Sequence, residues 1–285
     1  MKLIIRKLIN KVSIFKILFN ILKYILGKAS LTSVSPIYFD GWKMATGTRT
    51  PWINGGSSAL SCHFSETDSK LKRLVAEKKI ILTQFKPQNV LAELEGLMWR
   101  HYIVYWSANY AIKNTKSKTK IFAEFGVCDG LTIFYAISAA KNLDEPFKIY
   151  LYDAWDEMKE EFLLDSEKTS AGSYSYLSLE NTKNNLNHLN VKELIYNKGY
   201  IPGVFDRADN PKELAWMHID LNASMPTIHA LENFWDSLEV GGIILFDDFA
   251  WPGYEDTQAE VEKWACDKKC NILHLPTGQA ILFKL

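Results

Sequence analysis

From Lys120 onward, short apolar runs alternate with longer stretches in which apolar residues recur every three or four positions. The short runs predict strands and the longer stretches predict helices. Apolar strands that alternate with helices form a parallel sheet covered on both faces. The predicted strands are Ile121–Phe125, Lys148–Tyr152, Glu193–Asn197, Ala215–Leu221, Gly242–Phe246, Asn271–Leu275 and Ala280–Lys284, and the predicted helices are Leu131–Asn142, Ser178–Leu189, Met225–Leu238 and Asp256–Lys268.

The last two predicted strands are separated only by the residues from Pro276 to Gln279. A connection this short joins antiparallel strands, whereas parallel strands need a crossover of a dozen or more residues. We therefore expect an α/β fold with a doubly wound, mostly parallel seven-stranded sheet that ends in an antiparallel hairpin.

The first 28 residues have the pattern of an amphipathic helix, with apolar residues on one stripe and bases opposite. This segment carries seven bases and no acid, which predicts binding to an anionic membrane surface and a peripheral location on the inner face. Docking on its own domain or on a second subunit is the alternative. No charge-free run approaches the roughly 18 residues that a spanning helix needs.

Between this helix and Lys120 the pattern is mixed. Residues 29–87 contain Ser, Thr, Gly and Pro clusters and predict an irregular cap or substrate-side region, with one helix near Ser69–Lys78. Residues 88–114 predict one long helix, whose aromatic residues could be core or subunit contacts in a homo-oligomer. We expect residues 88–285 to form a single Rossmann-like domain.

The formal net charge of zero hides an asymmetry. Outside residues 1–28, 26 bases stand against 33 acids, a balance of −7. A protein region with this net negative charge is not expected to attract nucleic acid. The four cysteines are too scattered for a disulfide framework, which favours a cytoplasmic protein.

The stretch IFAEFGVCDG, residues 121–130, ends a predicted strand in Gly126 and Gly130. In a doubly wound sheet, ligands bind beyond the carboxyl ends of the strands, where glycine lets the backbone come close to them. The spacing does not match the GxGxxG fingerprint, because Cys128 and Leu131 take the second and third places. A dehydrogenase is therefore disfavoured, although a strand can also end in glycine for steric reasons alone.

The next predicted strand ends in Asp153, 23 residues after Gly130. An acid at this position can accept hydrogen bonds from both ribose hydroxyls of an adenine nucleoside; a helix cap or loop residue is the alternative. Glu124 could meet the charged amino-acid end of such a ligand, directly or by ordering the loop. Trp155 could cover the adenine or belong to the core. Together these residues indicate S-adenosylmethionine.

Two further strands end in acids: Asp220 follows one, with Asn222 two residues later, and Asp247 and Asp248 follow the other. Three carboxylates at one sheet edge would repel one another unless a positive charge intervened. A divalent cation with oxygen ligands, Mg²⁺ in particular, would supply that charge and activate an acceptor hydroxyl. Asp220 or Asp247 would then take the proton. The alternatives are that an aspartate caps the following helix without a metal, or that His218 is the base.

The segments GVCDG, NKGYIPGVF, HIDLN and LEVGGIILFDDFAWPGY resemble the macrocin O-methyltransferase family, which methylates sugars in antibiotic pathways. The resemblance covers residues 90–285. It implies a class I methyltransferase fold, a magnesium site at Asp220, Asp247 and Asp248, and a contact of Gly199 and Tyr200 with S-adenosylmethionine. The family tends to have a second aspartate where this chain has Asn222.

We therefore expect an S-adenosylmethionine-dependent O-methyltransferase that acts on a hydroxyl of a sugar or of a glycosylated or lipid-linked acceptor, assisted by a divalent metal. One alternative is a metal-independent methyltransferase for another small-molecule nucleophile. Another is a membrane-tethered protein that binds S-adenosylmethionine without turnover.

Overall fold

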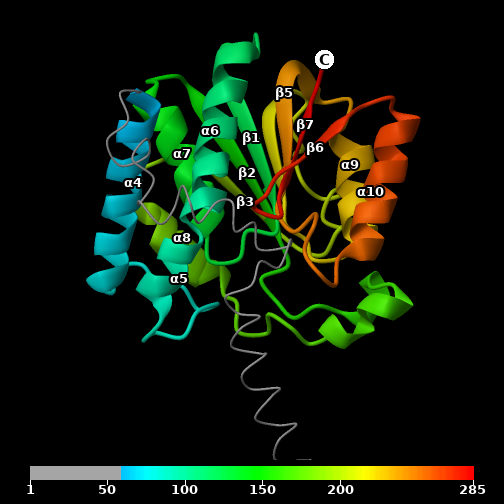
Figure 1. The fold of residues 1–285 in the computed structure, drawn as a ribbon, viewed down its shortest axis with the longest axis horizontal. Coiled ribbons are helices and arrows are strands. Elements are labelled where there is room, and N and C mark those ends of the chain that lie inside the picture. Colours follow the sequence, from blue (N-terminus) through cyan, green and yellow to red (C-terminus); the bar gives the residue numbers. More distant parts are fainter. Residues whose placement is uncertain (1–58) are drawn as a thin grey trace, which may run out of the picture. The chain divides into compact units, whose positions relative to one another are not determined.

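The computed structural model describes residues 59–285, and the predicted amphipathic helix of residues 1–28 lies outside them. The described chain contains one sheet, shown in Figure 1. Its strands are β1 (Lys120–Phe125), β2 (Phe147–Asp153), β3 (Leu194–Lys198), β4 (Leu214–Ile219), β5 (Leu238–Phe246), β6 (Ile272–His274) and β7 (Ala280–Phe283).

The strand order is β3-β2-β1-β4-β5-β7-β6. Strands β1 to β5 are parallel, and β7 runs antiparallel to both β5 and β6. The predicted mostly parallel seven-stranded sheet with an antiparallel C-terminal hairpin is confirmed. Strand β4 ends at Ile219, two residues earlier than predicted, so Asp220 is the first residue beyond the strand.

Helices cover both faces of the sheet (Figure 1). On one face lie α6 (Met98–Asn114), α7 (Leu131–Asn142) and α8 (Leu179–Asn187), and on the other lie α9 (Ser224–Phe234) and α10 (Glu255–Asp267). Each helical layer encloses its own apolar core against the sheet. Strand residues supply alternate side chains to the two cores, since successive side chains point to opposite faces.

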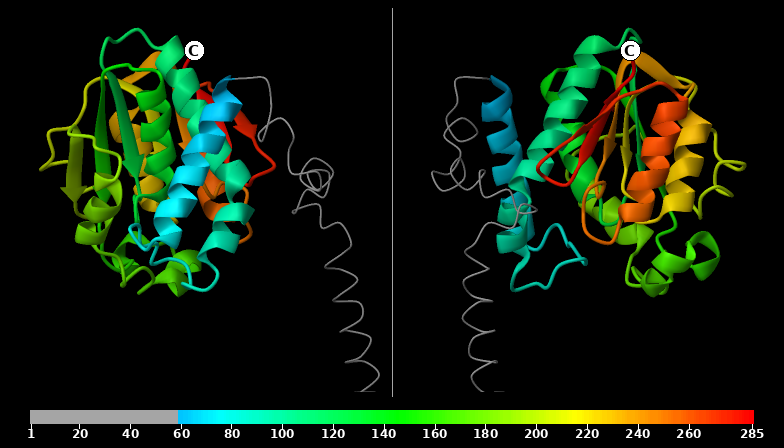
Figure 2. Two further views of the ribbon diagram at one scale, coloured as in Figure 1. Left: turned by 90° about the vertical axis from the view of Figure 1, so that its left-hand side faces the viewer. Right: turned by 45° about the vertical axis from the view of Figure 1, so that its right-hand side comes forward.

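Two helical segments before β1 differ from the prediction. Helix α4 (Ala59–Ala76) begins ten residues before the predicted start at Ser69 and packs along the outside of α7, as Figure 2 shows. The predicted long helix is broken at Leu97 into α5 (Val90–Gly96) and α6. Gly96, a poor helix former, ends α5, and the break places the first turn of α6 at the edge of the sheet.

A long connection follows β2 and contains two short 3₁₀ helices, η2 (Glu160–Phe162) and η3 (Asp165–Ser170). We call residues 154–177 the β2–α8 connection. Glu167 in η3 accepts hydrogen bonds from the backbone N–H and the hydroxyl of Ser224, the first residue of α9. Phe162 stacks on Tyr200, whose hydroxyl donates to the carbonyl of Glu157. The connection is thus fastened at several points near the carboxyl ends of the strands.

None of the helices within residues 59–285 is long and apolar enough to cross a membrane.

Candidate active site

A cavity of about 190 Å³ opens beyond the carboxyl ends of β1, β2, β3 and β4. Strand β1 is paired with β2 on one side and with β4 on the other, so this is where the chain changes direction across the sheet. Ligands of doubly wound sheets bind at such a point. The sequence-predicted residues that line the cavity are Gly126, Asp153, Gly199, Tyr200, Asp220 and Asp248.

Gly126 follows β1 directly and has φ +84°. A Cβ atom at this position would lie 1.8 Å from the carbonyl oxygen of Asp220, because the backbones after β1 and β4 approach each other closely here. The N–H of Asp220 donates to the carbonyl of Phe125 at 2.8 Å, which holds the two chain segments together. Glycine is therefore required by this close approach as well as by the φ angle.

Asp153 lies at the end of β2 and is mostly buried. One carboxylate oxygen accepts the backbone N–H groups of Val127 and Cys128 at 2.7 and 2.8 Å, and the other accepts that of Trp155. Burial raises the pKa of Asp153, although these hydrogen bonds oppose the effect. The carboxylate thus orders the glycine turn after β1, and it also lines the cavity.

Three other predicted cofactor residues are not among those that line this cavity. Trp155 is buried in the core, where its indole N–H contacts Thr182 and the carbonyl of Cys128, so the core interpretation is supported for this residue. Gly130 is the left-handed residue that begins α7 and lies against Leu186. Glu124 is completely buried within the sheet and pairs with His218.

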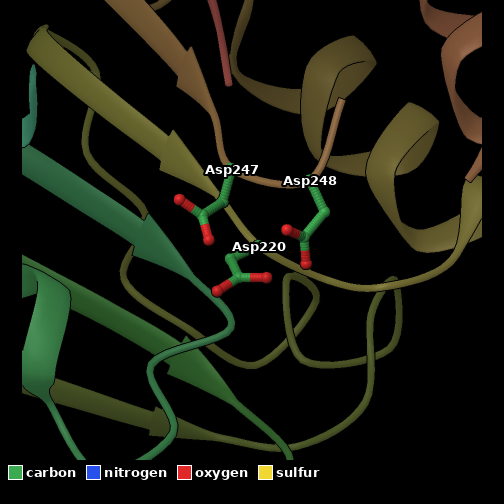
Figure 3. Close-up of side chains that lie close together, drawn as sticks. All are labelled: Asp220, Asp247 and Asp248. Carbon is green, nitrogen blue, oxygen red and sulfur yellow. The ribbon is translucent and has the colours of Figure 1, made fainter. Parts of the chain in front are cut away.

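The carboxylates of Asp220, Asp247 and Asp248 converge at the ends of β4 and β5, as Figure 3 shows. Each offers an oxygen atom, and these atoms all lie within 4.8 Å of one another. A second cavity, of about 230 Å³, reaches the cluster from the side of α6 and the first turn of α7. Asp220 and Asp248 line both of these cavities, whereas Asp247 lines only the second of the two.

Arg100, in the first turn of α6, supplies a positive charge to this cluster. Its Nη2 atom hydrogen-bonds to Asp247 and, at 2.8 Å, to Asp248. The sequence interpretation missed this residue. Its signal was a single arginine within an aromatic and apolar helical run, which indicates a buried charge that must have partners.

The charges in the cluster are unequal. Burial alone would raise the pKa of Asp247, but Arg100 and His218 outweigh burial and hold this pKa below its usual value. Burial, reinforced by the charges of Asp247 and Asp248, raises the pKa of Asp220 well above its usual value. Burial and Asp247 also raise the pKa of Asp248, against the opposing effect of Arg100. The surroundings therefore favour the ionised form of Asp247 and the protonated form of Asp220.

His218 connects the sheet interior to the cluster. Its Nδ1 lies 2.9 Å from Glu124 on the neighbouring strand, and its Nε2 lies 3.6 Å from Asp247. Burial would lower the pKa of His218, but these two carboxylates raise it. The ring is fully buried and is not among the residues that line either cavity, which disfavours His218 as the base.

Asn222 adopts φ +54° and lies beside the cluster. Its Nδ2 donates to Asp220 at 3.2 Å, and its side-chain oxygen accepts the hydroxyl of Tyr254. The loop residue Trp251 lies under Arg100, with 5.6 Å between Cζ and the ring centroid. These contacts place two aromatic residues of the loop after β5 at the edge of the cluster.

The donor chemistry of the cluster fits a divalent cation that prefers oxygen ligands, since three carboxylates meet within reach of one another. Arg100 competes for the same groups. S-Adenosylmethionine fits the first cavity, which combines the glycine turn with apolar and aromatic walls from Phe162, Leu163 and Tyr200.

Residues 123–249 match the model of a family described as a methyltransferase domain. The fold is similar to that of the O-methyltransferase NovP, with a TM-score of 0.58 and 15% identity over 66% of this chain and 80% of that chain. It is also similar to the calicheamicin methyltransferase CalS11, with a TM-score of 0.55 and 18% identity over 77% of this chain and 91% of that chain. No curated protein sequence matches the chain.

The fold, the cavity at the switch point and the family match agree with the resemblance found in the sequence. Over residues 123–249 this chain therefore carries a methyltransferase domain, in a fold that the O-methyltransferase NovP shares.

Proposed function

We propose that this protein transfers the methyl group of S-adenosylmethionine to a hydroxyl of a sugar or of a glycosylated or lipid-linked acceptor. The observation that carries the proposal is the meeting of two cavities at Asp220 and Asp248. The two cavities also share Gly126 in the glycine turn, whereas only the first is lined by Asp153 and only the second by Arg100 and Asp247. Cofactor and acceptor would then meet at a carboxylate that can take a proton.

The cofactor would lie in the first cavity, with its nucleoside near Asp153, Gly199 and Tyr200 and its sulfonium near Gly126 and Asp220. When bound, it supplies an electrophilic methyl group. Asp153 would hold the glycine turn that contacts the cofactor. With its remaining lone pairs, the carboxylate could also accept a hydrogen bond from a ribose hydroxyl.

Asp220 would be the general base, because it lines both cavities. Asp247 suits this role less well, since Arg100 and Gln279 engage its two oxygens. Mg²⁺, held by Asp220, Asp247 and Asp248, would acidify the acceptor hydroxyl. The hydroxyl acceptor itself is proposed by analogy with NovP, an O-methyltransferase, and the sugar by the resemblance of the sequence to the macrocin O-methyltransferase family.

The experiment is a methyl-transfer assay with labelled S-adenosylmethionine and a panel of nucleotide sugars and glycosides. We expect label on a hydroxyl oxygen, and we expect Asp220→Asn to lower kcat by about a hundredfold or more. Asp236→Asn, at an exposed site after α9, is the matched control. Label on nitrogen or sulfur, or full activity in Asp220→Asn, would contradict the proposal.

The ion pairs of Arg100 favour a second candidate, methyl transfer without a metal, because a permanent cation already faces Asp247 and Asp248. The same assay in excess chelator separates the two candidates. Retained turnover supports the second, and loss of turnover that Mg²⁺ restores supports the first.

A further inference from the structure

We infer that Arg100 and a divalent cation compete for Asp247 and Asp248, so that Arg100 sets the affinity of the carboxylate cluster for metal. The inference rests on the proposed assignment of this cluster as a cation site. The new element is the role of Arg100, a residue of α6, in controlling whether the cation binds.

The contacts of Asp247 are the first reason. Its Oδ1 accepts the side-chain N–H of Gln279 at 2.9 Å, and its Oδ2 accepts Nη2 of Arg100. The oxygen that Gln279 leaves available is therefore the one that Arg100 holds. The positive guanidinium beside this oxygen opposes the approach of a second cation.

The position of the guanidinium is the second reason. The same Nη2 atom lies against both Asp247 and Asp248, between the two carboxylates that a cation would bridge. A magnesium ion coordinates oxygen at about 2.0–2.1 Å, which leaves no space for a nitrogen atom between the same oxygens. Arg100 and a cation that used these same two oxygens would therefore compete for space as well as by charge.

Arg100 has a place to move to. It lines the second cavity, of about 230 Å³, and its Cζ atom already lies 5.6 Å from the ring centroid of Trp251. An arginine over a tryptophan face is stabilised by the ring quadrupole. Withdrawal onto Trp251 would release the carboxylates without leaving the guanidinium in an apolar environment.

The test measures binding of Mn²⁺, as a paramagnetic probe for the site, by electron paramagnetic resonance of the free ion and by calorimetry. We compare the wild type with Arg100→Gln, which keeps hydrogen-bonding capacity and removes the charge, and with Arg100→Lys, which keeps the charge but not the planar fork. Arg73→Gln, at an exposed site in α4, is the control for loss of an arginine. Thermal unfolding of each variant verifies that it is folded.

We expect Arg100→Gln to bind Mn²⁺ at least tenfold more tightly than the wild type, Arg100→Lys to lie between them, and Arg73→Gln to equal the wild type. Adding Asp248→Asn to Arg100→Gln should remove the gain. Equal Mn²⁺ affinity of the wild type, Arg100→Gln and Arg100→Lys would overturn the inference, as would a gain that survives Asp248→Asn. Failure of the proposed function would appear separately, as absent binding of S-adenosylmethionine to the wild type.

Discussion

Gly126 lies where strand β1 meets the first cavity, and the backbone there has no space for a Cβ atom. Its φ of +84° disfavours a side chain, and the carbonyl of Asp220 excludes one, because this oxygen would lie 1.8 Å from a Cβ atom at Gly126. Gly172 has nearly the same φ, +79°, but no atom within 4 Å of such a Cβ. A comparison of alanine substitutions at these two glycines therefore separates the cost of backbone strain from the cost of steric conflict.

We predict that Gly126→Ala destabilises the protein much more than Gly172→Ala does. The control should cost about 1–2 kcal/mol, the penalty for a left-handed non-glycine residue. Gly126→Ala should add the cost of forcing β1 and β4 apart and should weaken binding of S-adenosylmethionine. Urea unfolding and calorimetry measure both effects. Equal unfolding free energies of the two variants would contradict the geometry.

His101 predicts a pH dependence of stability. It is buried in α6 against Tyr135, and burial lowers its pKa to about 3. Below about pH 6.5, this histidine binds a proton in the unfolded chain but stays neutral in the folded chain. Stability should therefore fall as the pH drops below about 6.5, by up to about 1.4 kcal/mol per pH unit from this residue.

His101→Phe, which keeps the stacking on Tyr135, should make this decline shallower in urea unfolding between pH 7 and pH 5. The control substitution His229→Gln, at an exposed position, should leave the pH-dependent decline in stability as in the wild type. An unchanged slope in His101→Phe would show that His101 is not kept neutral in the folded state.

At the residue scale, the sequence located the acids and glycines but not their partners. Asp220, Asp247 and Asp248 could be placed together because parallel strands end at one edge. Arg100 could not, because its contact with them depends on where α6 begins, and the break at Leu97 fixes that point. For Glu124 and Trp155 the sequence left both a ligand contact and an internal role open, and the structure gives both residues internal partners.

At the scale of elements, the β2–α8 connection forms one wall of the first cavity. Met158, Phe162 and Tyr174 from this connection line the cavity. Glu167 fastens it to the first residue of α9, and it also accepts the N–H of Leu164. The segment has only short 3₁₀ helices, so its position depends on such side-chain contacts.

We predict that Glu167→Ala speeds hydrogen exchange in residues 159–176 and weakens binding of S-adenosylmethionine by about tenfold. The melting temperature should change little, because the two apolar cores lie elsewhere. Glu161→Ala, an exposed change in the same connection, is the control. If exchange in this segment is the same in Glu167→Ala and the wild type, the anchoring role is wrong.

The order of strands and helices after Lys120 followed from the sequence because the hydrophobic period is clear there, although α9 ends at Phe234 and β5 begins at Leu238, each four residues earlier than predicted. The region before it was harder to predict. The start of α4 was missed because small and polar residues there gave no apolar period, and the break between α5 and α6 was missed because apolar residues continue across it. The β2–α8 connection has no regular period, so its course over the cavity could not be predicted.

At the scale of the whole molecule, charge is divided along the chain. The body has a balance of −7, and residues 1–28, outside the described part, carry seven bases. We propose that this segment binds anionic membrane surfaces. Each base contributes about 1 kcal/mol near such a surface.

We predict that the full chain floats with vesicles that contain anionic lipid and not with neutral vesicles. Replacement of Lys2, Arg6, Lys7 and Lys11 by glutamine should reduce flotation strongly, while the methyltransferase domain remains folded. Equal flotation of the substituted and the wild-type chain would reject the membrane role of these residues.

The most direct test of the account is calorimetric titration of the wild-type chain with S-adenosylmethionine. We predict one binding site, an affinity at least tenfold weaker in Asp153→Asn and in Tyr200→Ala, and wild-type affinity in Asp236→Asn. Absence of heat with the wild type, or unchanged affinity in both cavity variants, would contradict the claim that the cofactor binds beyond the carboxyl ends of β1 to β4.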